Sequence, residues 1–308
     1  MEATAYLVPA ERGILQISGE DRVAFLQGLI SNDVAKVAPA RPAAPGRVIY
    51  AAFLTAQGRF LHDFFVAAIG ENLFLDCEAE RLEDLRRRLS PYRLRSKVTL
   101  AAVSHSHVAA LIFGPHALAA LNLPQDVGHA AALGRGIVYV DPRLAALGAR
   151  AILPRDEFQL LQRPGFVAGD GAAYERLRLS LGVPDGSRDL PVEKALLLEN
   201  GFDDLNGVDW DKGCYVGQEL TARMKYRLLV RKRLVPVQID GPTPAPATPV
   251  MLGDQEAGVM RSASGRLGLA LLHLEAIEQS EKAATPLTAA SARLTPARPA
   301  GGASKVAG

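Results

Sequence analysis

The sequence has little cysteine, few aromatic residues and almost no net charge. Of 308 residues, two are cysteine and one is tryptophan, and aromatic residues make up 6%. Cys77 and Cys214 lie far apart in unrelated contexts, so we expect neither a disulfide framework nor a zinc knuckle, and a reducing compartment fits. A net charge of +2 excludes a global field that draws the protein to nucleic acid or anionic membrane.

Several motifs of common enzyme classes are missing as well. The sequence holds no Gly-x-Gly-x-x-Gly, no P-loop, no Cys-x-x-Cys and no hydrolase elbow, which argues against the usual nucleotide, redox and acyl-transfer sites. It has no long apolar run and no secretory signal of the kinds that mark spans and export. We therefore expect a cytoplasmic protein with no membrane contact and no direct nucleic acid partner.

What is present is an ordinary globular composition, with 48% hydrophobic and 22% charged residues. The length predicts two or three domains. Strands mixed with helices recur twice before Pro184 and predict two α+β lobes. After Arg233, a Pro-rich stretch and short apolar strands at 250–252, 257–261 and 267–272 indicate a small β domain.

The helices follow from apolar spacing. Val23, Leu26 and Ile30 mark the face of one expected helix, and Leu82, Leu85 and Leu89 mark the face of the next. A third helix is expected over 171–181, with Tyr174, Leu177 and Leu181 on its buried face, and a fourth over 218–226, with Leu220 and Met224 inside and a Glu219–Arg223 pair outside.

The stretch from Lys212 to Glu219 looks built for chemistry. It comprises Lys212, Gly213, Cys214, Tyr215, Val216, Gly217, Gln218 and Glu219. The two glycines let the chain turn and let a partner approach the sulfur. Lys212 and the start of the following helix would favour the thiolate. The pattern predicts a reactive or ligating thiol; the alternative is a small buried hydrophobe.

Asp63 lies inside an apolar strand, which is costly unless the carboxylate has a partner. It either contacts a ligand or pairs with an arginine. Six basic residues crowd into 223–233. They either bind an anion, such as a carboxylate tail, an acidic partner or RNA phosphate, or form a solvated rim. His105 and His107 lack a nearby third metal ligand.

The run from Leu205 through Arg223, with Lys-Gly-Cys-Tyr-Val-Gly-Gln-Glu at its centre, resembles the signature of the YgfZ family. Members of this family are folate-binding relatives of the glycine cleavage T-protein that help mature iron-sulfur proteins, and they include a mitochondrial [4Fe-4S] assembly factor. The resemblance extends through Arg12–Leu15, Phe25–Leu29, Gln57–Arg59 and Arg231–Leu234.

The resemblance implies a GcvT-like α+β fold, in which two interleaved lobes form a folate-type pocket and a β-barrel follows. The implied boundaries are 1–228 for the folate-binding region (lobes about 1–97 with 185–228, and 98–184), 229–300 for the barrel and 301–308 for a disordered tail. Asp63 then corresponds to the aspartate that faces the folate nitrogens. Gln159 stands where the T-protein grips the pterin with glutamate, so tetrahydrofolate binding is implied without that charge.

The function implied is that of an iron-sulfur cluster maturation protein that offers Cys214 to a carrier or client protein. One cysteine cannot hold a cluster alone, so a cluster would be transient or shared with a partner. Effects on tRNA modification would be indirect, through cluster enzymes. The alternatives are a folate-dependent aminomethyl or one-carbon transferase, and a pure adaptor whose folate pocket is vestigial.

Overall fold

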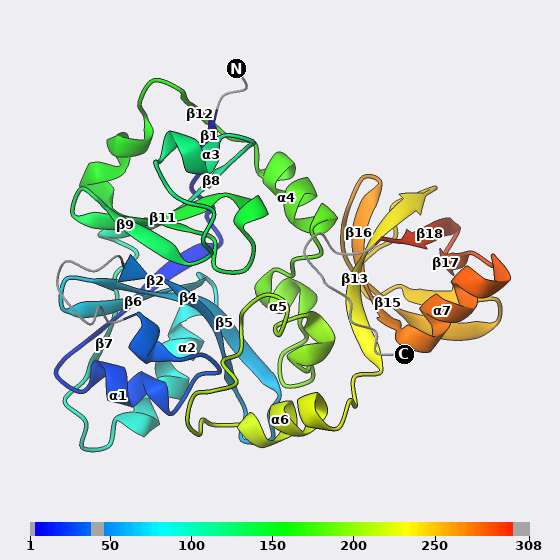
Figure 1. The fold of residues 1–308 in the computed structure, drawn as a ribbon, viewed down its shortest axis with the longest axis horizontal. Coiled ribbons are helices and arrows are strands. Elements are labelled where there is room, and N and C mark those ends of the chain that lie inside the picture. Colours follow the sequence, from blue (N-terminus) through cyan, green and yellow to red (C-terminus); the bar gives the residue numbers. More distant parts are fainter. Residues whose placement is uncertain (1–3, 38–45, 298–308) are drawn as a thin grey trace. The chain divides into compact units, whose positions relative to one another are not determined.

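The computed structural model describes residues 4–37 and 46–297, and the chain divides into two compact units (Figure 1). The first unit contains Met1–Ala56, Leu61–Gly171 and Leu205–Gln218, and the second contains Gln57–Phe60, Ala172–Asp204 and Glu219–Gly308. No helix in the described ranges is long and apolar enough to cross a membrane.

A seven-stranded sheet forms one half of the first unit. Its strands, in spatial order, are β12 (Phe166–Ala168), β1 (Thr4–Leu7), β8 (His107–Phe113), β11 (Ala149–Pro154), β10 (Gly136–Val140), β9 (His129–Leu133) and β3 (Gly46–Arg47). The strands β8, β10 and β11 are almost wholly buried. Their side chains form an apolar core with α3 (Ala117–Ala120) and the short 3-10 helix η4 (Arg155–Leu161).

A five-stranded sheet forms the other half of the first unit. Its strands, in spatial order, are β4 (Ile49–Leu54), β5 (Phe60–Ile69), β6 (Asn72–Glu78), β2 (Arg12–Ser18) and β7 (Thr99–Ala102). The helix α2 (Leu82–Leu89) contacts β2 and β7, and its three leucines are buried as predicted. The helix α1 (Arg22–Gln27) and the 3-10 helices η1 (Val34–Lys36), η2 (Ser90–Arg93) and η3 (Ala145–Leu147) complete this unit.

The second unit centres on a closed barrel. Its strands, in order around the barrel, are β13 (Lys232–Asp240), β16 (Leu267–His273), β15 (Gln255–Ser264), β14 (Pro249–Leu252), β17 (Leu287–Ala289) and β18 (Ala292–Pro296). Alternate residues of β13, such as Val235 and Val237, fill the barrel, while Leu234 packs outside it against Leu179. The helices of this unit are α4 (Gly171–Ser180), α5 (Gly186–Asp189), η5 (Leu198–Asn200), α6 (Gln218–Tyr226) and α7 (Leu274–Ala283).

The predicted fold class, α+β with a C-terminal β-barrel, is confirmed. The sequence prediction of α6 matches its observed bounds, and the Glu219–Arg223 ion pair is present. The predicted tail at 301–308 lies outside the described residues.

Two predicted helix faces are only partly right: Leu26, Ile30 and Leu181 are buried as predicted, and the others are not. The helix α1 ends at Gln27, before Ile30, and it buries Phe25 and Leu26 in place of Val23. In α4 the side chains of Arg178 and Leu179 are buried, whereas Tyr174 and Leu177 are only half-buried. Apolar spacing missed Arg178 because its guanidinium is neutralised inside the protein by Asp189 and Glu175.

Candidate functional site

Asp209 anchors residues 209–217, which we name the Cys214 loop. One carboxylate oxygen of Asp209 accepts the backbone N–H groups of Asp211 and Lys212 at 2.8 and 3.0 Å. The other oxygen forms an ion pair with Lys36. Burial works against the charge, but these bonds outweigh it and lower the pKa of Asp209. The loop therefore starts from a fixed point.

Lys212 fixes the same loop to the segment that follows α1. Its Nζ donates to the backbone oxygens of Gln27, Ile30 and Asn32 at 2.8, 2.6 and 2.8 Å. An ammonium has three N–H donors, so these carbonyls use all of them. Burial lowers the pKa of Lys212 to about 8, and Asp33 and Asp209 oppose that shift. The sequence predicted that this ammonium would favour the thiolate of Cys214. In the structure it binds backbone carbonyls instead.

The remaining motif residues shape the end of the loop. The buried Tyr215 ring lies 5.1 Å from Lys212 Nζ, a cation–π distance. The backbone N–H of Val216 donates to Gly28 O at 3.1 Å, and the side chain of Gln218 accepts the backbone N–H of Tyr215 at 3.3 Å. Gly217 has a φ of +81°, a left-handed conformation that glycine adopts without strain before α6.

Cys214 is exposed at the tip of this anchored loop, where α6 has not yet begun. Gly213 beside it has open space where a side chain would stand, so nothing in the described chain requires a glycine there. Cys77 differs in every respect: it is buried in β6, its Sγ donates to Gly13 O at 3.6 Å, and burial raises its pKa to about 12. Only Cys214 is presented to a partner or a ligand.

Asp63 and Gln159 lie in different surroundings. Asp63 is buried in β5 and accepts a hydrogen bond from the hydroxyl of Tyr50 at 2.7 Å. Burial, followed by Asp63, raises the pKa of Tyr50 well above its usual value. Gln159 is exposed on η4.

Sequence reasoning missed a buried charge cluster that connects the two sheets of the first unit. Asp76 on β6 accepts from Arg12 at 2.7 Å and from Arg150 on β11 at 2.6 Å. Although burial opposes it, the two guanidiniums lower the pKa of Asp76. Arg150 also lies 4.0 Å from the ring centre of Phe65. The sequence does show a charged residue inside each of these apolar strands, but it does not show which charged residues pair with one another.

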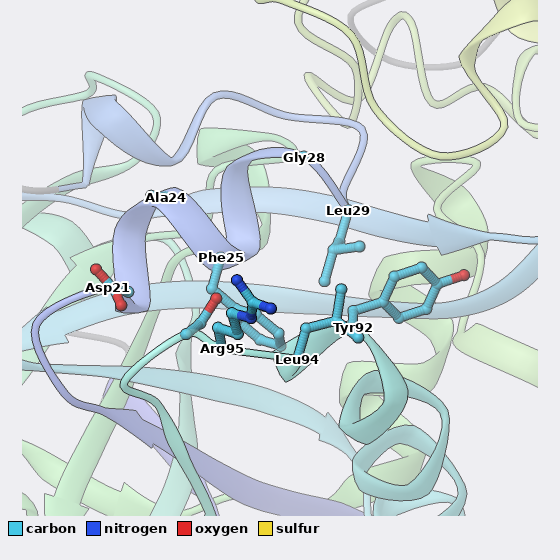
Figure 2. A pocket seen from close by; sticks show the side chains of 9 residues that line it. Asp21, Ala24, Phe25, Gly28, Leu29, Tyr92, Leu94 and Arg95 are labelled. Carbon is cyan, nitrogen blue, oxygen red and sulfur yellow. The ribbon is translucent and has the colours of Figure 1, made fainter.

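A cavity of about 880 Å³ lies between α1 and residues 92–96, and we name it the α1 groove (Figure 2). Its α1 side includes Phe25 and Gly28, and its loop side includes Tyr92, Leu94 and Arg95. Because Gly28 also accepts the backbone N–H of Val216, the groove adjoins the Cys214 loop. No group of three or more His, Cys, Asp or Glu residues within the described ranges is arranged to hold a metal ion.

The basic run at 223–233 is only partly free for an anion. Arg223 pairs with Glu219, and Arg233 pairs with Asp203 and Asp204. Within this run, the apolar side chain of Leu228 is 85% exposed.

Comparison with known families identifies two domains in the chain. Residues 11–132 match the GCVT N-terminal domain, and residues 231–301 match the CAF17 C-terminal beta-barrel domain. The glycine cleavage system aminomethyltransferase T of Bartonella henselae superposes with a TM-score of 0.71 over 96% of this chain and 85% of that protein. With 14% sequence identity, this likeness concerns the fold alone.

Curated relatives carry one common name. The chain is 39% identical over 280 residues to the mitochondrial iron-sulfur cluster assembly factor IBA57 of Homo sapiens, covering 87% of this chain and 77% of the human protein. The IBA57 protein of Mus musculus is 36% identical with the same coverage, and the homolog of Mycosarcoma maydis is 34% identical over 77% of this chain and 58% of its own length.

These names correct two expectations. The cytoplasmic location is wrong, because the relatives are named mitochondrial proteins; the absence of a recognisable export signal does not bear on that destination. The sequence predicted membership of the YgfZ family as a whole. The relatives carry the IBA57 name and not that of YgfZ.

Proposed function

Because this chain belongs to the IBA57 family of iron-sulfur cluster assembly factors, we propose that it assists cluster assembly by offering Cys214 as one ligand of a shared cluster. The partner protein, a carrier or a client, supplies the remaining ligands, since common clusters need four. Cys214 releases its proton as its sulfur binds iron.

The exposure of Cys214 on an anchored loop carries this proposal. A ligand that joins a partner's cluster has to be accessible and held in place, because ordering a mobile loop on binding costs free energy. Asp209 and Lys212 supply that order, because Asp209 accepts a backbone N–H of the loop itself and Lys212 donates to the backbone oxygens of Gln27 and Ile30. Gly213 leaves room at the sulfur, which suits close approach by a bulky cluster.

The test is complementation of a deletion strain. Wild type, Cys214→Ser and Cys77→Ala are expressed at matched levels, and the activities of several [4Fe-4S] enzymes are measured. We expect Cys214→Ser to fail while Cys77→Ala, which removes the buried thiol, rescues. Effects on tRNA modification would follow only where the modifying enzyme needs a cluster. Equal rescue by wild type and Cys214→Ser would remove this motif from the mechanism.

Tetrahydrofolate binding through Asp63 and Gln159 stays a prediction, and no step of the proposed function runs through it. Calorimetry at millimolar ligand tests it: heat that disappears in Asp63→Ala would restore that residue to a binding site. We expect no aminomethyl transfer from a lipoyl carrier to tetrahydrofolate above background, because Gln159 offers a pterin no charge and this chemistry needs precise placement of the reacting carbon. Robust turnover would favour the transferase alternative.

A further inference from the structure

The α1 groove has a mixed apolar and polar lining, with two protruding side chains at its rim. Leu94 is 91% exposed and Tyr92 is 42% exposed. Figure 2 shows Leu29, Leu94 and Tyr92 converging at the Gly28 end of α1, while Asp21 lies at the other end. The edge of Tyr92 is held by a T-shaped contact with the buried ring of Phe53 at 6.1 Å. Large exposed apolar side chains around a hollow mark an interaction surface.

The backbone holds Leu94 outward at a cost. Leu94 has a φ of +41° and a ψ of −107°, a strained conformation that a residue with a Cβ rarely adopts. The hydrogen bond from Ser96 N–H to Arg93 O at 2.6 Å closes the turn around it. The strain places an apolar side chain in water, which brings no benefit to this chain alone.

The charge at the groove is positive. Arg95 lines the cavity and Arg93 is exposed beside it, and within the described ranges neither guanidinium has an ion-pair or hydrogen-bond partner. The carboxylate of Asp21 accepts the backbone N–H of Lys97 at 2.7 Å, and the Lys97 ammonium is paired with Glu20. The groove therefore complements an acidic segment that carries an apolar side chain.

The groove is continuous with the Cys214 loop. Gly28 lines the groove, its carbonyl accepts the backbone N–H of Val216, and the preceding carbonyl, Gln27 O, accepts a hydrogen bond from Lys212 Nζ. A protein seated in the groove thus contacts the same short piece of backbone that positions the thiol.

We propose that the α1 groove docks the cluster partner through an acidic segment with one apolar anchor, which packs on Leu94 and Tyr92 while its carboxylates meet Arg93 and Arg95. This inference rests on the proposed function, since it names the surface by which the partner of Cys214 is held. Desolvated apolar contacts supply most of the affinity, and the two arginines supply steering that weakens with salt.

A photo-crosslinker in the groove tests the occupant. Tyr92 is replaced by p-azidophenylalanine in the full-length protein, and cells are irradiated. We expect an adduct to an acidic segment of an iron-sulfur protein. Leu94→Gly in the same chain removes the side chain and relieves the strained φ, so it should lower the adduct yield about tenfold without unfolding the protein. An adduct to lipid, RNA or a basic segment, or no adduct, overturns the proposal.

Leu228→Gly is the matched control. Leu228 also follows a Tyr-Arg pair, has a positive φ of 51° and is 85% exposed, but it does not line the groove. We expect it to leave the adduct unchanged. Equal losses in Leu94→Gly and Leu228→Gly would refute a specific role of the groove.

Rescue of cluster enzymes separates the two proposals. If Cys214→Ser fails but the double variant Leu94→Gly, Arg95→Glu rescues like wild type, the groove proposal is wrong and the role of Cys214 stands. If Cys214→Ser rescues fully, the proposed function is wrong. If Cys214→Ser and the double variant both fail to rescue while Leu228→Gly rescues, the result supports docking of the partner in the groove.

Discussion

Replacing Lys212 with methionine tests whether this lysine supports the loop or activates the thiol. Methionine keeps an unbranched apolar side chain but leaves the carbonyls of Gln27, Ile30 and Asn32 without their donor. Each carbonyl left unsatisfied in a buried position costs about 1–3 kcal/mol, and removing the charge recovers part of the desolvation that lowers the lysine pKa to about 8. The balance is a loss of about 2–4 kcal/mol of unfolding free energy.

Guanidinium chloride unfolding measures this loss. The fluorescence of Trp210, the only tryptophan, reports the Cys214 loop itself, and circular dichroism reports the whole chain. Lys97→Met is the control: its ammonium forms an exposed pair with Glu20, so its loss should cost less than about 1 kcal/mol.

The rate at which Cys214 is alkylated distinguishes the two roles. Because Lys212 Nζ donates to carbonyls and uses all its N–H groups there, we expect alkylation in Lys212→Met to be as fast as in wild type, or faster where the loop is loosened. An unchanged unfolding midpoint together with slower alkylation would refute this reasoning and return Lys212 to the thiol.

Three further predictions concern buried groups. Asp76→Asn leaves two buried guanidiniums without their carboxylate and should cost about 3–5 kcal/mol in denaturant unfolding, whereas Asp126→Asn, in an exposed pair, should cost less than about 1 kcal/mol; equal costs would argue that the buried cluster is accessible to water. Burial, followed by the charge of Arg81, lowers the pKa of His62 from 6.5 to about 4. The unfolded chain therefore takes up this proton at a higher pH than the folded chain, and the unfolding free energy should fall by about 3 kcal/mol as the pH drops from about 6.5 to 4. A His62→Gln protein with the same pH profile would contradict this. In native protein only Cys214 should react with a thiol reagent, with Cys77 joining in denaturant, and two reactive thiols in the native state would show that β6 opens.

Much of the secondary structure depended on local spacing and could be predicted. The leucines at 82, 85 and 89 recur at helical intervals and are buried as expected, and the residues of α6 are helical from Gln218 to Tyr226. The motif around Cys214 could be identified as well, because two glycines flanking a cysteine leave few structural explanations. Neighbours in sequence carry this information, so no tertiary contact is needed to read it.

Only the tertiary structure decided where the charged side chains go. The ammonium of Lys212 binds carbonyls that precede it by 180 to 185 positions, and Asp76 meets an arginine 74 positions further along the chain. Such pairings arise when two sheets or a loop and a helix pack together, and no periodicity encodes them. The same holds for the strain at Leu94, which exists because the surrounding turn fixes a φ that leucine itself disfavours. Sequence therefore singled out the motif around Cys214, while packing determined that Lys212 binds backbone carbonyls and that Cys214 faces outward.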